Sequence, residues 1–241
     1  MSNESAPAPG RLIPLSLGVM DYRLCLDLQN RLHARVAAGE PAAYLLFVEH
    51  PPVLTLGKHA DPRHLMFAEA AYRAEGVDVV AIDRGGEVTA HEPGQLVVYP
   101  ILRLEDFRLA PRAYVTLLED AVIETLAHFG VVGGRDPEHP GVWTGDRKIC
   151  ALGVRIRARV TIHGLTLNVR NSLELFGKIV PCGIQGRGVT SLTRELGRPV
   201  AMAAVQDELA QALTGRLAAR ANAYTVAAGL QWPVEDLMIR S

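Results

Sequence analysis

The stretch from Trp143 to Val169 constrains the fold most strongly, because its apolar residues follow no helical period. It contains two runs rich in β-branched residues, Lys148–Arg157 and Arg159–Val169, with only a short turn between them. Such runs predict two strands that pair side by side. Elsewhere helices and strands are predicted in irregular succession, without the regular βαβ alternation that builds a parallel sheet. The sequence therefore predicts an α+β fold with a mixed, largely antiparallel sheet and flanking helices, rather than a doubly wound parallel sheet.

The other helices and strands are predicted from the spacing of apolar residues and from the glycines and prolines that interrupt helices and strands. From Leu24 to Val36 an apolar side chain recurs every four positions, and Gly39 ends the pattern, as expected for an amphipathic helix. Cys25 lies on or beside the apolar face and is expected to be part of the core. Helices are predicted at residues 21–38, 67–75, 111–129 and 200–220, and further strands at residues 43–49, 53–56, 77–82 and 96–102.

Length and composition are those of a globular protein that can bury a sizeable core. The chain has 241 residues, of which 49% are hydrophobic and 21% charged. Its first ten residues, MSNESAPAPG, are predicted to be a disordered arm. No linker rich in Ser, Gly and Pro divides the remainder, so residues 11–241 are predicted to form a single domain.

Charge and cysteine content argue against several classes of protein. The 25 basic residues balance 26 acidic ones, whereas binding along a nucleic-acid backbone needs a basic surface. Apolar stretches such as residues 42–48 are far shorter than the roughly 20 residues that span a bilayer, and the N-terminus lacks the features of a secretory signal. The three cysteines cannot all be paired and include no CxxC motif. We therefore expect a cytoplasmic protein with reduced thiols, which binds neither nucleic acid nor a membrane.

Three segments contain residues suited to binding or catalysis, and the first is Arg84–Gln95 (RGGEVTAHEPGQ). Its paired glycines permit positive φ angles and a close approach of a ligand to the backbone. Backbone amides and the side chains of Arg84, Thr89 and His91 can hydrogen-bond a carbonyl or phosphate group. A loop that merely connects two strands explains the same composition equally well. The chain has neither a P-loop nor a GxGxxG motif, so its sequence does not indicate nucleotide binding.

The second segment is Val142–Gly153 (VWTGDRKICALG), in which a predicted tight turn places Lys148 at the start of an apolar strand. In one interpretation, Lys148 is a charge on an edge strand that deters aggregation. In the other, Lys148 points into a cleft, where its amine is suited to acid–base chemistry.

The third segment is Phe176–Ile184 (FGKIVPCGI), which places Cys182 between a proline and a glycine. Such a turn is stiff and exposed, whereas Cys150 lies between Ile149 and Ala151 and is typical of a buried residue. A thiol becomes a good nucleophile when a nearby cation lowers its pKa. Cys182 is therefore the predicted nucleophile, with Lys148 or His163 as the activating group.

Taken together, these segments resemble the octanoyl transferase family, also called lipoate-protein ligase B. The resemblance covers about residues 41–196. The matching strings are RGGEVTAHEPGQLVVY (Arg84–Tyr99), KICALG (Lys148–Gly153), HGLTLNV (His163–Val169), IVPCGI (Ile179–Ile184), EHPPVLTLG (Glu49–Gly57) and VTSL (Val189–Leu192). Two positions depart from the family pattern: Cys150 replaces a small residue such as alanine, and Glu92 stands where glycine is common.

The resemblance implies a catalytic domain with the fold of biotin and lipoate protein ligases, which is related to class II tRNA synthetase cores. It implies transfer of an octanoyl group from acyl carrier protein, through a thioester on Cys182, to a lysine of a lipoyl domain. Lys148 would lower the pKa of the Cys182 thiol and then, in its neutral form, act as the base, with His91 as the alternative base. The positions implied to bind substrate are Arg84, Gly85, Gly86, Glu87, Val88, Thr89, Ala90, His91, Ala151, Leu152, Gly153, Gly164, Leu165 and Thr166. An apolar tunnel for the acyl chain is expected near Val88, Leu152 and Leu165.

The same resemblance implies the partners. Octanoyl-acyl carrier protein is the donor, and its phosphopantetheine arm carries the acyl group. The acceptors are lipoyl domains of 2-oxoacid dehydrogenases and the glycine cleavage H protein. Exchange between thioesters is nearly isoenergetic and amide formation from a thioester is downhill, so neither ATP nor a metal ion is expected. We expect a monomer, with Arg147 and Lys178 as candidate contacts for the carrier protein.

Three alternatives remain open at this level. An ATP-dependent lipoate or biotin ligase on the same fold would need an adenylate site and no cysteine nucleophile. A catalytically silent carrier-binding module would leave Cys182 and Lys148 as packing residues. A cysteine hydrolase is less well supported, because no Cys/His/Asn signature of a protease family is visible.

Overall fold

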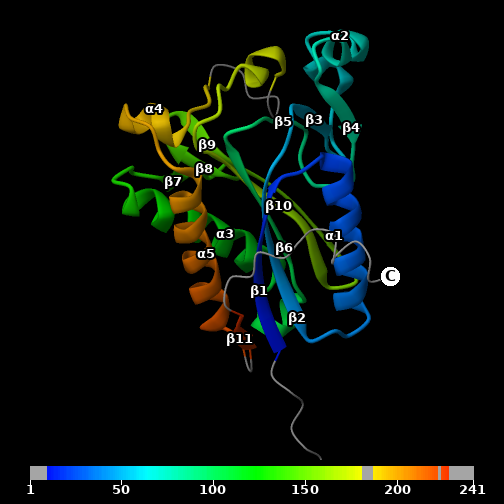
Figure 1. The fold of residues 1–241 in the computed structure, drawn as a ribbon, viewed down its shortest axis with the longest axis vertical. Helices are drawn as coiled ribbons and strands as arrows, with labels where there is room; N and C mark the ends of the chain where they lie inside the picture. The colour runs from blue at the N-terminus through cyan, green and yellow to red at the C-terminus, as the bar shows by residue number, and fades with distance from the viewer. Residues whose placement is uncertain (1–9, 181–186, 222–223, 228–241) are drawn as a thin grey trace, which may run out of the picture.

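The structure, a computed structural model, describes residues 10–180, 187–221 and 224–227. Its largest element is an eight-stranded sheet with the strand order β11-β1-β2-β6-β10-β9-β8-β7 (Figure 1). The strands are β1 (Gly10–Val19), β2 (Ala42–Glu49), β6 (Gln95–Ile101), β7 (Gly134–Arg135), β8 (Val142–Thr144), β9 (Arg147–Arg157), β10 (Val160–Asn168) and β11 (Tyr224–Val226). β1 begins at Gly10, which the sequence places in the disordered arm, and residues 1–9 lie outside the described residues.

The pairing in this sheet confirms the predicted mixed, largely antiparallel arrangement. β9 and β10 form the predicted antiparallel hairpin, and the turn residues Ala158 and Arg159 have φ angles of 48° and 64°. Positive φ at both central residues is typical of the tight turns whose twist matches that of paired strands. Within the described part of the chain, the parallel pairs of this sheet are β1 with β2 and β1 with β11. A doubly wound parallel sheet is therefore excluded.

A smaller sheet contains β4 (Asp78–Ala81), β3 (Val53–Leu56) and β5 (Val88–His91), in that order. β5 corrects the interpretation of residues 84–95 as a loop, because all four of its residues are buried and pair with β3 in antiparallel register. The Gly-Gly and Pro-Gly pairs on either side of β5 explain why this short strand has a loop-like composition.

The helices include the four predicted ones, close to their expected positions, and a short one at residues 192–196 that the sequence does not predict. They are α1 (Tyr22–Ala37), α2 (Glu69–Ala74), α3 (Pro111–His128), α4 (Leu192–Leu196) and α5 (Met202–Ala218), with short 3₁₀ turns at Pro62–His64, Leu104–Phe107 and Leu175–Lys178. Asp21 caps α1 by accepting hydrogen bonds from the backbone N–H groups of Arg23 and Leu24. Leu24 itself is 50% exposed, while Cys25 is buried. A helix has 3.6 residues per turn, so side chains spaced four residues apart drift gradually around it and do not all face the core. In the described residues, no helix combines the length and apolarity that a membrane span requires.

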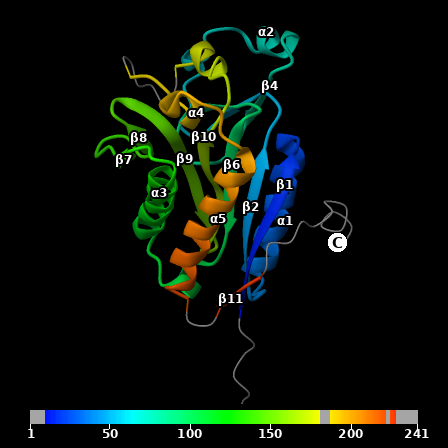
Figure 2. The same ribbon diagram turned by 60° about the vertical axis from the view of Figure 1, so that its left-hand side comes forward.

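Two hydrophobic cores lie on opposite faces of the large sheet. α1 covers one face, and α3 and α5 cover the other (Figures 1 and 2). β2 supplies both cores by alternation: Leu45 and Phe47 belong to the core of α3 and α5, and Tyr44 and Leu46 to that of α1. The small sheet has a third core that includes Tyr72 and Phe176.

Gly164 in β10 is expected to be essential for this packing. A Cβ atom at this position would lie 2.0 Å from the backbone oxygen of Val98 in β6. We predict that Gly164→Ala lowers the free energy of unfolding by about 3 kcal/mol. Gly215→Ala in α5 is the matched control, because a Cβ added there would meet nothing within 4 Å and alanine favours a helix. Denaturant titrations that showed equal effects for the two substitutions would contradict the close approach of β6 and β10.

Candidate active site

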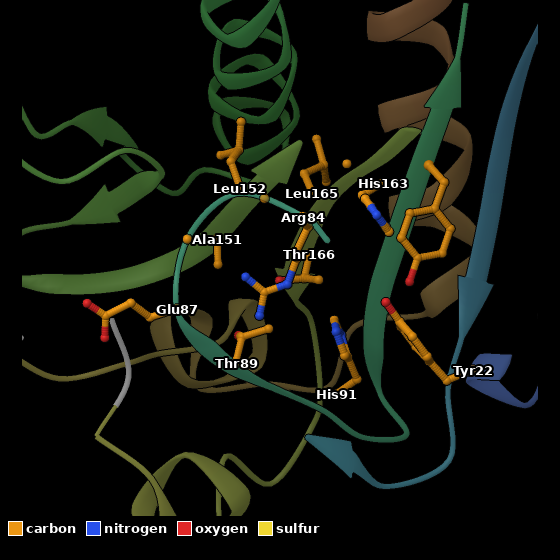
Figure 3. Close-up of a pocket in the computed structure, with 14 residues that line it drawn as sticks. Tyr22, Arg84, Glu87, Thr89, His91, Ala151, Leu152, His163, Leu165 and Thr166 are labelled. Carbon is orange, nitrogen blue, oxygen red and sulfur yellow. The ribbon is translucent and has the colours of Figure 1, made fainter. Parts of the chain in front are cut away.

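The predicted binding segments come together around one pocket, which we call the inner pocket. The segment 84–91 with β5, the middle of β9 and the middle of β10 surround it, together with one side chain from α1 and one from β6. Figure 3 shows Leu152 and Leu165 on one side of this pocket and Tyr22, His91 and His163 on another. The lining residues are Tyr22, Arg84, Gly86, Glu87, Thr89, His91, Tyr99, Ala151, Leu152, Gly153, His163, Gly164, Leu165 and Thr166.

A larger outer pocket of about 550 Å³ adjoins the inner one. The two share Gly86, Glu87 and residues 151–153 as a common wall, and Gly85 lines the outer pocket. Lys148 lies in the outer pocket, whereas His163 lies in the inner one. Cys182 lies outside the described residues.

Two of the predicted substrate-binding residues line neither of these pockets. Val88 and Ala90 are fully buried and pack into the core of the small sheet, among residues such as Leu54 and Tyr72. Since side chains alternate along a strand, Thr89 and His91 of the same strand face the inner pocket. Any contact of Val88 or Ala90 with a ligand would therefore be made through the backbone.

Arg84 is held by the backbone of the site. Its guanidinium donates to the carbonyl oxygen of Thr55 at 2.8 Å, to Oγ1 of Thr55 at 3.0 Å and to the carbonyl oxygen of Gly85 at 3.0 Å. A Cβ at Gly153 would lie 2.8 Å from Cδ of Arg84, so glycine is needed there to admit this side chain. The buried arginine therefore ties β3 to the segment that forms the pocket wall.

His91 is neutral and its orientation is fixed. Nε2 of Gln95 donates to the backbone oxygen of Ala90 and to Oδ1 of Asn168, which leaves Oε1 of Gln95 to accept from Nδ1 of His91 at 2.9 Å. Burial, followed by the nearby His50, holds the pKa of His91 well below its usual range. A weak base of this kind is poorly suited to deprotonate an amine, which argues against His91 as the alternative base.

His163 is also uncharged at neutral pH. Burial, followed by the positive charge of Arg84, lowers its pKa to about 4. Its Nε2 lies 3.0 Å from the carboxylate of Asp83, and its φ of 61° is unusual for a residue within a strand. A neutral imidazole cannot supply the cation that a thiolate needs, so His163 is a poor candidate for the activating group.

The sequence does not single out Tyr22 and Tyr99, which line the inner pocket, or His50, whose ring contacts both of them. His50 donates through Nδ1 to the backbone oxygen of Met20 at 2.7 Å, so its Nε2 accepts from the hydroxyl of Tyr99 at 2.9 Å. The ring of Tyr22 stacks on His91 with centroids 5.7 Å apart. These aromatic residues are indistinguishable from core residues in the sequence, and only the fold brings them together.

Glu92 has a defined role here, although it departs from the family pattern. Its carboxylate accepts hydrogen bonds from the side chains of Asn171 and Ser172 and from the backbone N–H of Leu173, which has a φ of 68°. Glu92 thus fixes the turn after β10, which leads toward residues 175–180. Cys150, the other departure, is fully buried in the core, and burial raises the pKa of its thiol above the usual range.

The two suggested contacts for a carrier protein are already paired within the chain. Arg147 forms an ion pair with Glu195 at 3.1 Å, and Lys178 forms one with Glu75. Arg147 and Glu75 are about half-exposed in these pairs, and exposed ion pairs contribute little to stability.

Comparisons with known proteins agree with this geometry. Residues 21–214 match the family described as "Lipoyl protein ligase A/B catalytic domain". The fold is shared with the crystal structure of lipoate-protein ligase A bound with ATP (TM-score 0.73, 17% identity, 95% of this chain and 92% of that one) and with a bi-partite lipoate protein ligase from Thermoplasma acidophilum (TM-score 0.70, 15% identity, 95% and 90%). The chain thus has the fold of a lipoyl protein ligase A/B catalytic domain.

Relatives with higher identity narrow the assignment. The octanoyltransferase of Roseiflexus sp. (strain RS-1) is 46% identical over 196 residues, which cover 80% of this chain and 82% of that protein. The octanoyltransferase of Flavobacterium johnsoniae is 51% identical over 197 residues, which cover 75% and 85%. The chain belongs to the octanoyltransferase family, whose members are acyltransferases, as its sequence motifs predicted.

Proposed function

We propose that this enzyme transfers an octanoyl group from acyl carrier protein to a lysine of a lipoyl domain, through a thioester on Cys182. The observation that carries the proposal is the pair of adjoining pockets, one lined by the predicted binding segments and the other containing Lys148. The proposed contacts of the acyl chain are Leu152 and Leu165, since each methylene that they bury contributes about 0.8 kcal/mol.

The position of Lys148 supports its proposed role beside the nucleophile. The backbone N–H of Lys148 donates to the carbonyl oxygen of Gly188, and its carbonyl accepts from the N–H of Thr190, both at 3.0 Å. Val180 donates to the carbonyl oxygen of His64 at 2.9 Å. The chain after residues 181–186 is therefore bonded to Lys148 itself, and the chain before them to His64, whose side chain pairs with Glu87 of the shared wall.

The reaction balances with Lys148 as the only titrating group besides the nucleophile. In the first step the Cys182 thiolate attacks the donor thioester, the carbon–sulfur bond to pantetheine breaks, and the departing thiolate takes a proton from the Lys148 ammonium. In the second step the acceptor amine attacks the enzyme thioester and gives its proton to neutral Lys148. The Cys182 thiolate leaves as the amide forms, which restores the starting state.

We further propose that the reaction needs neither ATP nor a metal ion. The proposed enzyme is a monomer that works in the cytoplasm, where thiols stay reduced. The proposed acceptors are the lipoyl domains of 2-oxoacid dehydrogenases and the glycine cleavage H protein.

Reconstitution with purified components tests this function. Protein treated with a chelator and then mixed with octanoyl-carrier protein and a lipoyl domain should octanoylate the domain at the same rate with and without ATP and Mg²⁺. Free octanoate with ATP should give no product. Product formed only from the free acid and ATP would show that the chain is a ligase instead.

A further inference from the structure

β9 has an irregularity at the residue that bears the proposed base. Val142 of β8 pairs with Cys150, and Trp143 pairs with Lys148, so Ile149 is an extra residue on β9. This is a β-bulge, a feature that redirects side chains. The consecutive residues Ile149 and Cys150 are both fully buried in the core beneath α3. The bulge therefore places two neighbours in the core, while Lys148 lines the outer pocket.

Trp143 is the residue opposite Lys148 across this bulge. The Nζ atom of Lys148 lies 4.8 Å from the centroid of the indole ring, within the range of a cation–π interaction. The ring is 4% exposed and donates its Nε1–H to the backbone oxygen of His139 at 3.1 Å. Gly141 leaves room for the lysine stem, since a Cβ there would lie 3.3 Å from Cε of Lys148.

A second cation fixes the same ring. The guanidinium carbon of Arg187 lies 3.7 Å from the indole centroid, and Arg187 forms an ion pair with Asp136 at 2.5 Å. The charge of Arg187 is thus matched by a carboxylate. Lys148 forms no ion pair with any residue in the described part of the chain, so the indole is the group that the structure shows beside its ammonium.

We propose that Trp143 is a positioning residue that holds the Lys148 ammonium toward the outer pocket, where it acts on the proposed nucleophile. The face of the indole ring attracts the ammonium of Lys148. A carboxylate in its place would form an ion pair and neutralise the positive charge that the thiolate needs. This inference rests on the proposed function of Lys148. In this role Trp143 acts through the lysine and takes no part in the acyl transfer itself.

The small number of lysines allows the surroundings of Lys148 to be measured by NMR. The chain has only three lysines, Lys58, Lys148 and Lys178. Reductive ¹³C-methylation therefore gives three resolvable side-chain NMR signals, assigned with Lys58→Arg and Lys178→Arg. We expect an upfield ring-current shift for Lys148 that disappears in Trp143→Leu and decreases in Trp143→Phe.

The functional readouts are alkylation of Cys182 as a function of pH and steady-state octanoyl transfer. In Trp143→Leu the alkylation midpoint should rise by about one pH unit, and kcat should fall about tenfold with little change in KM for the octanoyl donor. Trp143→Phe should lie between the wild type and Trp143→Leu, because the phenyl face attracts cations more weakly than indole does. Val142→Ala is the matched control: it removes buried side-chain volume from the neighbouring position but should leave the alkylation midpoint and the Lys148 signal unchanged.

The outcomes separate this inference from the function on which it rests. If Lys148→Ala raises the alkylation midpoint and Trp143→Phe leaves both the midpoint and the NMR shift unchanged, Trp143 does not position Lys148. If Val142→Ala shifts the midpoint as far as Trp143→Leu does, the effect of Trp143 is general packing and the inference also fails. If Lys148→Ala itself leaves the midpoint unchanged, the proposed role of Lys148 is wrong.

Discussion

Replacing Cys182 by serine is expected to abolish octanoyl transfer, with a loss of more than about 10³-fold in kcat/KM. A serine hydroxyl remains protonated at neutral pH and is a far weaker nucleophile than a thiolate. Stability should change little, since the substitution exchanges one small polar group for another. The measurement is the rate at which a lipoyl domain gains an octanoyl group, together with a denaturant titration of the variant.

Cys150→Ala and Cys25→Ala are the controls for the Cys182 substitution. Both residues are fully buried, and burial raises the pKa of each thiol, to about 12 for Cys25. Neither thiol is suited to form a thioester, so both variants should retain transfer activity. Loss of transfer in Cys150→Ala with full activity in Cys182→Ser would reverse the assignment of the nucleophile.

Lys148→Ala is expected to lower the rate of transfer by about 10²- to 10⁴-fold, as loss of a general acid and base does. The pH at which Cys182 is half-alkylated should rise, because the nearby positive charge is lost. Thiol alkylation at a series of pH values, combined with transfer kinetics, measures both effects on the same preparation.

Lys148→Arg separates the two proposed roles of the amine. A guanidinium keeps the positive charge but does not lose a proton near neutral pH. The arginine variant should therefore keep most of the thiol activation and form the acyl-enzyme, with the departing pantetheine thiolate protonated by water instead, but transfer the acyl group to the lipoyl domain slowly. If Lys148→Arg slows acyl-enzyme formation and transfer to the lipoyl domain equally, the two proposed roles of the lysine are not separate, and the shape of its side chain is what matters.

Much of the fold can be predicted, because the longer elements follow simple periodicities. The hairpin of β9 and β10 is visible as two β-branched runs, and α3 as an apolar pattern that starts with Pro111. β1 is not predicted, since Pro14 interrupts its pattern and Gly10 reads as part of a polar arm. The parallel partners of β1 are set by long-range packing and leave no local signal.

The residues of the candidate site are predicted mainly through the family resemblance. The structure adds which of them face a pocket and which face a core. The alternation of β5 separates Thr89 and His91, which face the pocket, from Val88 and Ala90, which face a core. The bulge that directs Lys148 is likewise invisible in the sequence, because a single extra residue leaves the run Lys148–Arg157 looking regular.

Peptide mapping of the enzyme after mixing with octanoyl-carrier protein tests the central claim most directly. The account predicts that the mass of one octanoyl group is gained on the peptide that contains Cys182, that the group is released by hydroxylamine as thioesters are, and that it moves to a lipoyl domain added afterwards. An octanoyl group found on Cys150, or an active enzyme that never becomes acylated, would contradict it.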